Sequence, residues 1–218
     1  NGDFSISNID IGEYTLAVSH NDFENFSNSY SIEPNYNTDV GNIELTPKPS
    51  NLEGKIYSNH YDSGISGTTI TLEEIGRSTT TDSNGNFSIN NIESGSYTLS
   101  VQDSNHHNTS TNVDIGINQD KDIGTINLDI INGSISGITD PGQCSVSLNG
   151  SNNYSLTSSS DGTFTKSNIT PGIYDVTINN SNYYSLTKSN VEIKPDSNTD
   201  IGSVNLDPKP GSISGRII

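Results

Sequence analysis

The sequence predicts an all-β protein made of tandem β-sandwich repeats of about 80 residues each. Three observations lead to this prediction. Sets of similar motifs recur in a constant order, apolar and polar residues alternate along short segments, and clusters of Gly, Asn, Asp, Ser and Pro separate those segments. Alternation places one set of side chains on one face of a strand, and the turn-forming clusters reverse the chain. No stretch has the spacing of an amphipathic helix.

Three motifs mark the repeats. The first is Gly-x-Tyr, the second follows the pattern of "TDVGNIEL", and the third follows the pattern of "GSISGI". Successive copies of Gly-x-Tyr lie about 80 residues apart, and the other two motifs follow each copy in the same order. In that order the copies are Gly12–Tyr14, Gly95–Tyr97 and Gly172–Tyr174; Thr38–Leu45, Lys121–Leu128 and Thr199–Leu206; and Asn51–Ile56, Gly133–Ile138 and Gly211–Ile217.

The motif order also predicts the domain boundaries. It divides the chain into a partial repeat that holds the later strands (1–46), two complete repeats (50–129 and 132–207) and the first strand of a following repeat (211–218). Two boundaries contain Pro-Lys-Pro. Because proline fixes φ and lacks a backbone donor, these tripeptides predict short, stiff connectors. We expect the sequence to be a window cut from a longer array.

Each repeat contains two neighbouring strands that carry an aromatic residue. The segments Asp82–Gly85 and Ser159–Gly162 predict tight turns that lead into the strand with the phenylalanine. A tyrosine can bury its ring while its hydroxyl stays at the rim of the core. We therefore predict that one Phe–Tyr pair anchors the core of each repeat: Phe4 with Tyr14, Phe87 with Tyr97, and Phe164 with Tyr174.

The segment Thr81–Val101 has the pattern T-D-x-x-G-x-F-x-x-x-x-I-x-x-G-x-Y-x-L-x-V. This pattern resembles the carboxypeptidase regulatory-like domain. The resemblance implies an Ig-like, prealbumin-like (transthyretin-like) sandwich, so we expect seven antiparallel strands in each repeat. It also implies an accessory or tandem module of a secreted or surface protein. The resemblance covers both complete repeats, although the second of them has "SSSDGTF" in place of the Thr-Asp motif.

The composition argues against several functions. Hydrophobic residues make up 28% of the chain, which is low for a globular protein, so we expect thin cores. The net charge is −17 and the nine Lys and Arg residues are scattered, which argues against nucleic-acid binding. No apolar run in this window approaches the roughly 20 residues of a membrane span.

The single cysteine, Cys144, is expected to act as a small apolar residue. Acidity with almost no cysteine suits a microbial surface protein.

We predict no catalytic residues, no cofactor and therefore no enzyme. His20, His60, His106 and His107 do not recur at one place in the repeat, and we expect them to be solvated loop residues. The adjacent acids Glu73–Glu74 would point to opposite faces of a strand, which disfavours joint acid–base catalysis. No Gly-x-Ser-x-Gly motif occurs.

Two oxygen-rich segments are weak candidates for calcium ligands. The residues are Asp82 and Asn84 in one turn, and Asp120 and Asp122 in another. Calcium takes about six to eight oxygen ligands, several of them carboxylate, and neither segment holds a full Asp-x-Asp-x-Asp-Gly loop. Asx turns explain these residues without a metal. We therefore predict no metal site and keep calcium as the alternative.

Two surface features remain as candidates for binding or modification. The aromatic pairs Tyr57 with Tyr61, Phe23 with Phe26, and Tyr183 with Tyr184 could form a sugar-stacking platform. Acceptors for N-glycosylation are as frequent as the Asn, Ser and Thr content predicts by chance. They are Asn25, Asn86, Asn108, Asn132, Asn149, Asn153, Asn168 and Asn179.

The function that these observations favour is mechanical. We expect an extracellular structural repeat protein, part of a cell-surface stalk, adhesin shaft or filament, in which subunits could assemble by strand addition. Its partners would be other copies or neighbouring repeats. The alternatives are an adhesin module that binds a surface glycan or protein, and an accessory domain of a larger secreted enzyme.

Overall fold

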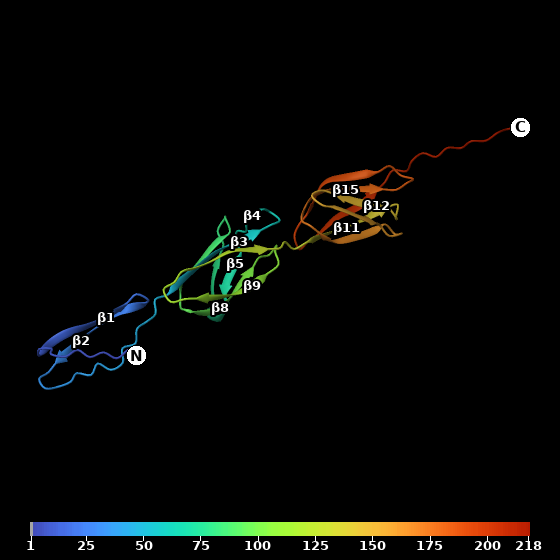
Figure 1. The fold of residues 1–218 in the computed structure, drawn as a ribbon. Coiled ribbons are helices and arrows are strands. Elements are labelled where there is room, and N and C mark those ends of the chain that lie inside the picture. The colour runs from blue at the N-terminus through green and yellow to red at the C-terminus, as the bar shows by residue number, and fades with distance from the viewer. Residues whose placement is uncertain (1) are drawn as a thin grey trace. The chain divides into compact units, whose positions relative to one another are not determined.

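The structure is a computed structural model that describes residues 2–218 (Figure 1). Strands and loops make up nearly all of this range, so the prediction of an all-β fold is confirmed. Within it the only helical element is the short 3₁₀ turn η1 (Glu73–Ile75). None of the described residues forms a helix of the length and apolarity that a membrane span requires.

The first repeat contributes one antiparallel hairpin. Its strands are β1 (Gly12–His20) and β2 (Phe23–Ile32), and the register pairs Tyr14 with Tyr30. The segments before and after the hairpin, residues 2–11 and 33–46, contain no strand.

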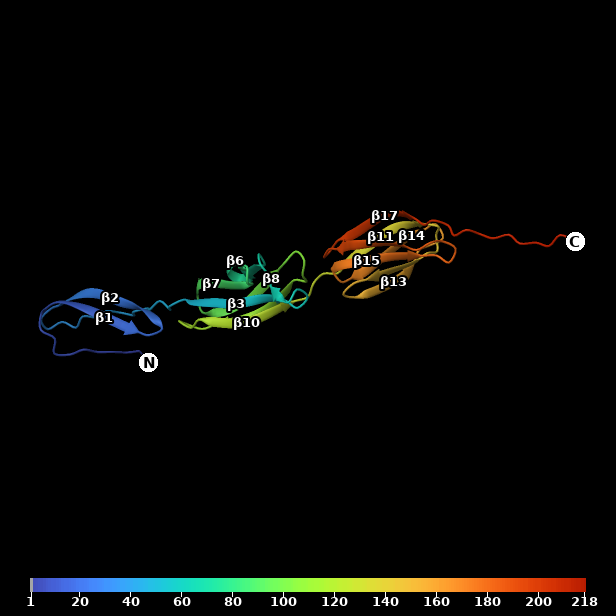
Figure 2. The same cartoon turned by 90° about the horizontal axis from the view of Figure 1, so that it is seen from above.

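Two sheets form the first complete sandwich (Figure 2). One sheet has the order β10-β3-β4, with β7 also paired to β3, and the other has the order β6-β5-β8-β9. The strands are β3 (Ser50–Ser58), β4 (Ser63–Gly64), β5 (Thr69–Leu72), β6 (Arg77–Thr80), β7 (Asn86–Ile92), β8 (Gly95–Gln102), β9 (Thr109–Ile115) and β10 (Lys121–Leu128).

The second complete sandwich has a three-stranded sheet, β14-β11-β17, and a four-stranded sheet, β13-β12-β15-β16. Together they give the seven strands that the resemblance implied. The strands are β11 (Gly133–Asp140), β12 (Ser145–Asn149), β13 (Asn153–Thr157), β14 (Thr163–Ile169), β15 (Gly172–Asn179), β16 (Leu186–Ile193) and β17 (Asn198–Asn205).

A strand pair of the second complete sandwich departs from the antiparallel expectation. β11 pairs with β14 antiparallel but with β17 parallel. Parallel neighbours need a long crossover connection, and here the whole four-stranded sheet lies between β11 and β17 in the chain. Alternation of polar and apolar residues does not reveal strand direction, so the sequence could not show this pair.

The predicted aromatic anchors of the two complete sandwiches are buried. Phe87, Tyr97, Phe164 and Tyr174 have at most 8% of their surface exposed. Each tyrosine hydroxyl donates a hydrogen bond to the carbonyl oxygen four residues earlier, over 2.9 Å for Tyr97 and 2.7 Å for Tyr174. A buried polar group needs such a partner, so the aromatic ring can close the core without leaving an unpaired hydroxyl.

The anchors of the first repeat are not buried. Phe4 is 53% exposed and Tyr14 is 43% exposed, so the prediction that they form a core is wrong for this chain. In the complete sandwiches, strands such as β3 and β11 cover the corresponding phenylalanines, and in the first repeat no described strand takes that place. The predicted first strand of a following repeat, residues 211–218, forms no strand either.

The predicted tight turns before β7 and β14 require glycine. Gly85 and Gly162 have φ of 83° and 85°. A Cβ at Gly85 would lie 2.3 Å from the carbonyl oxygen of Ile56, and one at Gly162 would lie 1.9 Å from that of Thr139. Both the left-handed backbone and the close approach therefore exclude a side chain.

The chain divides into two compact units that do not follow the strand repeats. The first comprises Asn1–Tyr57, Gly64–Val101 and Ser110–Ile126, and the second comprises Ser58–Ser63, Gln102–Thr109 and Asn127–Ile218. Residues 102–109 make backbone hydrogen bonds to the chain that follows β10, and Ser58 is hydrogen-bonded to His106 in that loop. These contacts form the site described next.

Candidate functional site: three connector clamps

The same pair of backbone hydrogen bonds fixes the chain after each repeat. A residue of the repeat donates its N–H to the connector, and a connector residue two positions further on donates its N–H back to the repeat. We call each such pair a connector clamp. The bonds are Glu24 to Thr46 (2.8 Å) and Lys48 to Asp22 (2.9 Å), His107 to Asp129 (2.8 Å) and Ile131 to Asn105 (2.8 Å), and Tyr184 to Asp207 (2.8 Å) and Lys209 to Asn182 (2.9 Å).

A ring-bearing residue lies at the centre of every clamp. In the central antiparallel bridge the ring-bearing residue is Phe23, the first residue of β2, in the first clamp, His106 in the second and Tyr183 in the third. The residues opposite them in the connectors are Pro47, Ile130 and Pro208, respectively. Identical bonding at three places shows that the clamp is a property of the repeat rather than an accident of one loop.

The Pro-Lys-Pro sequence fits the clamp. The bridging residue of the connector, Pro47 or Pro208, needs no N–H because the residues on either side of it make the two bonds. The central lysine adds a third contact, since the ammonium of Lys48 lies 2.8 Å from the carbonyl oxygen of Asn21 and that of Lys209 lies 3.1 Å from the carbonyl oxygen of Ser181. The predicted stiffness of these connectors thus has a structural cause beyond proline itself.

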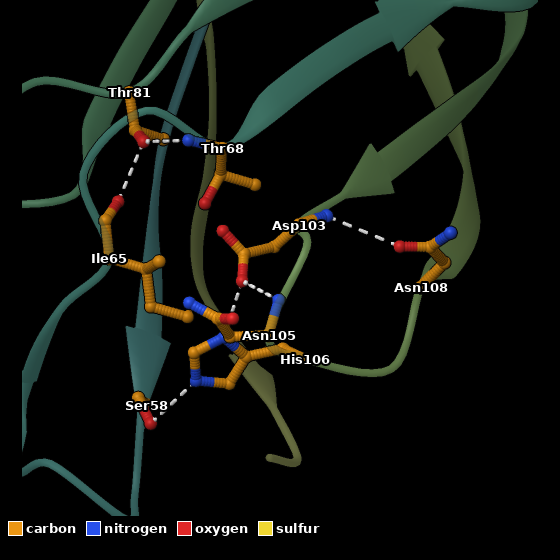
Figure 3. Close-up of polar contacts among 8 residues, drawn as sticks. All are labelled: Ser58, Ile65, Thr68, Thr81, Asp103, Asn105, His106 and Asn108. Atoms are coloured by element: carbon orange, nitrogen blue, oxygen red, sulfur yellow. Dashed lines mark hydrogen bonds and ion pairs between the residues drawn. The ribbon is translucent and has the colours of Figure 1, made fainter. Parts of the chain in front are cut away.

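In the second clamp the central ring belongs to a histidine whose two nitrogens are hydrogen-bonded, whereas the other two clamps have phenylalanine or tyrosine at this place (Figure 3). His106 is only 3% exposed. Its Nδ1 lies 2.6 Å from Oδ1 of Asp103, and its Nε2 lies 3.0 Å from Oγ of Ser58. A carboxylate only accepts hydrogen bonds, so Nδ1 carries the proton and donates to Asp103. The expectation that His106 is a solvated loop residue is therefore wrong.

This network holds a loop and does not present a nucleophile. Its order of groups, Ser–His–Asp, is the order found in serine hydrolases. Ser58, however, is completely buried at the end of β3, so its hydroxyl cannot reach a substrate. Oδ1 of Asp103 also accepts the N–H of Asn105 at 2.9 Å, which closes the loop that leads to the clamp. Hydrogen bonds thus link Ser58 at the end of β3 to the 103–106 loop, and this loop is in turn hydrogen-bonded to the connector.

A second buried hydroxyl, that of Thr81, fixes the loop between Ile65 and Thr68. Oγ1 of Thr81 donates to the carbonyl oxygen of Ile65 at 2.6 Å and accepts the N–H of Thr68 at 2.9 Å (Figure 3). In the second complete sandwich Oγ of Ser158 likewise accepts the N–H of Cys144 at 2.9 Å. Cys144 is fully buried in the core, as a small apolar residue would be.

The calcium candidates bind backbone groups of the protein instead of one another. Oδ1 of Asp82 accepts the N–H groups of Asn84 and Asn86, each at 2.8 Å, and these bonds lower the pKa of Asp82 below its ordinary value. Asp120 and Asp122 each accept one backbone N–H, from Asn51 and Gly124. Residues 2–218 hold no cluster of three or more His, Cys, Asp or Glu side chains arranged for a metal.

The remaining candidate residues lie apart from the clamps or at their surface. Glu73 and Glu74 lie on η1 and not on a strand, so their predicted strand geometry is wrong. Both oxygens of Glu74 accept hydrogen bonds from Thr98, whose backbone N–H is the main cause of the lowered pKa of Glu74. His20, His60 and His107 are exposed, as expected.

None of the three aromatic pairs exposes both of its rings, as a sugar-stacking platform would require. Phe23 and Tyr183 serve the clamps and are half-buried, which leaves Tyr61 and Tyr184 as the exposed rings of these pairs. The eight candidate glycosylation acceptors are all exposed.

Sequence reasoning missed the clamps because backbone hydrogen bonds leave no side-chain pattern. One signal could have found them. When the repeats are aligned on Gly-x-Tyr, the ring-bearing residues Phe23, His106 and Tyr183 all lie at the same distance after the glycine of that motif. The alignment also assigns His106 to a ring position and not to a solvated loop.

Comparisons with known proteins bear on the fold. The family model of the carboxypeptidase regulatory-like domain matches residues 51–129. Among solved structures, the Bacillus anthracis TIE protein superposes with a TM-score of 0.52 at 11% identity, over 90% of this chain and 42% of that one. A streptococcal ancillary pilin gives a TM-score of 0.37 at 14% identity, over 93% and 77%.

A third match is a type II cohesin–X-dockerin complex from Acetivibrio cellulolyticus, with a TM-score of 0.32 at 24% identity, over 36% of this chain and 56% of that one. The chain thus spans about half the length of this structure and of the TIE protein. No curated protein matches the chain by sequence. The family match and the fold agree with the motif pattern, so residues 51–129 are similar to the carboxypeptidase regulatory-like domain in both sequence and fold class.

Proposed function

We propose that this chain is part of an extracellular structural repeat protein, a cell-surface stalk, adhesin shaft or filament. The observation that carries the proposal is the connector clamp, which recurs with the same bonds after all three repeats. A repeat whose task is to bridge distance needs its connector held, because free connector residues would let neighbouring repeats rotate independently. The clamp leaves one residue between its last donor and β3, and one before β11.

The surface chemistry supports the same role. The exposed residues are mostly Asn, Ser, Thr and acids, and a net charge of −17 keeps such a chain soluble.

No catalytic role is proposed. The one Ser–His–Asp network among the described residues is buried and occupied in holding a clamp. An adhesin module that binds a glycan or protein remains the alternative, and the exposed rings of Tyr61 and Tyr184 are the residues that it would use.

Two experiments test the proposal. Antibodies raised against residues 51–129 should label intact cells of the source organism as strongly as permeabilised cells. Labelling that requires permeabilisation would overturn the extracellular assignment. Glycan-array binding by the chain that is lost in the variants Tyr61→Ala and Tyr184→Ala, and retained in the matched variant Tyr36→Ala, would favour the alternative, because Tyr36 is also an exposed tyrosine.

A further inference from the structure

A loop of the first complete sandwich makes two hydrogen bonds to the first clamp. The loop connects β9 to β10, and its residue Asn118 has a left-handed backbone with φ of 49°. The backbone N–H of Asn118 donates to the carbonyl oxygen of Lys48 at 3.0 Å, and its Nδ2 donates to the carbonyl oxygen of Asn21 at 3.1 Å. Lys48 lies in the connector and Asn21 in the turn between β1 and β2. One residue of the sandwich thus binds both the connector and the repeat before it.

Two donors meet at the carbonyl oxygen of Asn21. Besides the amide of Asn118, the ammonium of Lys48 lies 2.8 Å from this oxygen. A backbone carbonyl oxygen has two lone pairs, so these two donors use its full capacity. Asn118 and Asn21 are 97 residues apart in the sequence, and all three residues belong to one compact unit. The contact therefore joins two neighbouring repeats and does not merely close a local turn.

A buried hydroxyl fixes the loop that carries Asn118. Ser50, the first residue of β3, is completely buried. Its Oγ donates to the carbonyl oxygen of Gly116 at 2.8 Å and accepts the N–H of Gln119 at 2.7 Å. Gly116 and Gln119 also form an antiparallel bridge with each other. The loop is thus held on both sides of Asn118, which keeps the side-chain amide directed at the clamp.

The second connector has different side chains at the same places. Ile131 takes the place of Lys48 in its clamp. When the segments "KDIGTINL" and "TDIGSVNL" are aligned, Asp196 takes the place of Asn118, and it has the same left-handed backbone with φ of 45°. The backbone of the loop is therefore repeated, but its chemistry is not. Isoleucine has no polar group, and an ionised carboxylate accepts hydrogen bonds without donating any.

The second loop is also held differently against its sheet. Gly133 takes the place of Ser50, since each pairs with the last residue of the neighbouring strand, Ile169 or Ile92. A Cβ at Gly133 would lie 2.3 Å from the carbonyl oxygen of Lys194, so the backbone of the second loop leaves no room for a side chain there. The hydroxyl that fixes the first loop thus has no counterpart in the second.

We propose that a Pro-Lys-Pro connector and an asparagine of the following repeat form a lock between neighbouring repeats, and that the connector between the two complete sandwiches forms a joint without this lock. The joint lock consists of the bonds from Asn118 and from the ammonium of Lys48. The clamp fixes the connector to the repeat before it, and the joint lock fixes the repeat after it. The inference rests on the structural role proposed above and adds that the joints differ in stiffness along the chain.

Matched substitutions in the two loops test the joint lock. Asn118→Asp keeps the size of the side chain but removes the amide donor, and Asn118→Gly removes the side chain at a left-handed position that glycine tolerates. Asp196→Gly is the matched control in the second loop. Amide hydrogen exchange under native conditions reports on each clamp. We expect both Asn118 variants to speed exchange of the Lys48 amide about fivefold, because one neutral hydrogen bond is lost, and Asp196→Gly to leave the Ile131 amide unchanged.

Distances across each joint give an independent readout. Spin labels at the exposed positions Ser27→Cys and Ser78→Cys span the first joint, and labels at Ser78→Cys and Ser155→Cys span the second. Pulsed electron paramagnetic resonance then measures the distribution of distances. We expect Asn118→Gly to broaden the distribution across the first joint and Asp196→Gly to leave that across the second joint unchanged.

Two results would overturn the joint lock. One is unchanged exchange of the Lys48 amide, or an unchanged distance distribution across the first joint, in the Asn118 variants. The other is broadening of the second joint by Asp196→Gly to the same extent as Asn118→Gly broadens the first, since both joints would then depend equally on their loop residue. Neither result bears on the surface location or on the bonds of the clamps, which have tests of their own.

Discussion

The replacement of His106 by phenylalanine tests whether the buried network holds the second clamp. Phenylalanine occupies the corresponding place in the first clamp, so a ring of that kind fits this position of the repeat. The variant His106→Phe loses the bond to the Asp103 carboxylate and the bond to Ser58. A bond to a charged group contributes about 1.5–3 kcal/mol and a neutral one about 1 kcal/mol, so the free energy of unfolding should fall by about 2–4 kcal/mol.

The double variant Ser58→Ala/His106→Phe is the matched control. Ser58 is completely buried, and in the single variant its hydroxyl has lost its partner on His106. Its removal should restore about 1 kcal/mol. Hydrogen exchange under native conditions measures both effects at the amides of His107 and Ile131, which are the donors of the clamp. If His106→Phe leaves their protection within about 0.5 kcal/mol of the original, the network does not stabilise the clamp.

Three further predictions concern the second complete sandwich. Tyr174→Phe should cost about 1 kcal/mol because the 2.7 Å bond to Thr170 is lost, whereas Tyr14→Phe, at an exposed tyrosine, should cost nothing measurable by calorimetry; equal effects would contradict the assigned role of the buried hydroxyl. Leu148→Ala should cost about 2–5 kcal/mol and the exposed Ile173→Ala less than about 0.5 kcal/mol; a small effect at Leu148 would mean that the core is not packed as described. Hydrogen bonds from Ser159 and Thr163 lower the pKa of Asp161 from its ordinary 3.8 to about 2, so its carboxylate stabilises the native state above about pH 4 and this stability is lost as the pH falls towards 2. Melting temperatures of the Asp161→Asn variant should therefore decline less over that range than those of the original chain, and parallel curves would refute the assignment.

The sequence predicted the parts of the fold that repeat as side-chain patterns. Phe87 and Phe164 recur with their tyrosines, and both are buried because complete sandwiches surround them. Phe4 has the same pattern but is exposed, since alternation shows which face of a strand is apolar and not whether another strand covers it. The parallel pairing of β11 with β17 was hidden for a similar reason, because it depends on the path of the chain between them.

The clamps were only partly visible in the sequence. Pro-Lys-Pro indicated two of the three connectors, and its lysine and prolines do contact or bridge the loops. The second clamp has Ile130 where the others have proline, so composition alone did not mark it. The partners of His106 come from a neighbouring loop residue and from Ser58, 48 residues earlier, and no local pattern joins positions so far apart.

The most direct test of the account is a pair of proline substitutions in the second connector. Ile131 donates a clamp bond, so Ile131→Pro removes it, whereas Ile130 occupies the place that proline holds in the other two clamps. Spin labels at the exposed positions Ser78→Cys and Ser155→Cys report the distance between the two complete sandwiches by pulsed electron paramagnetic resonance. The account predicts a clearly broader distance distribution for Ile131→Pro and an unchanged one for Ile130→Pro. Equal distributions for both variants and the original chain would contradict it.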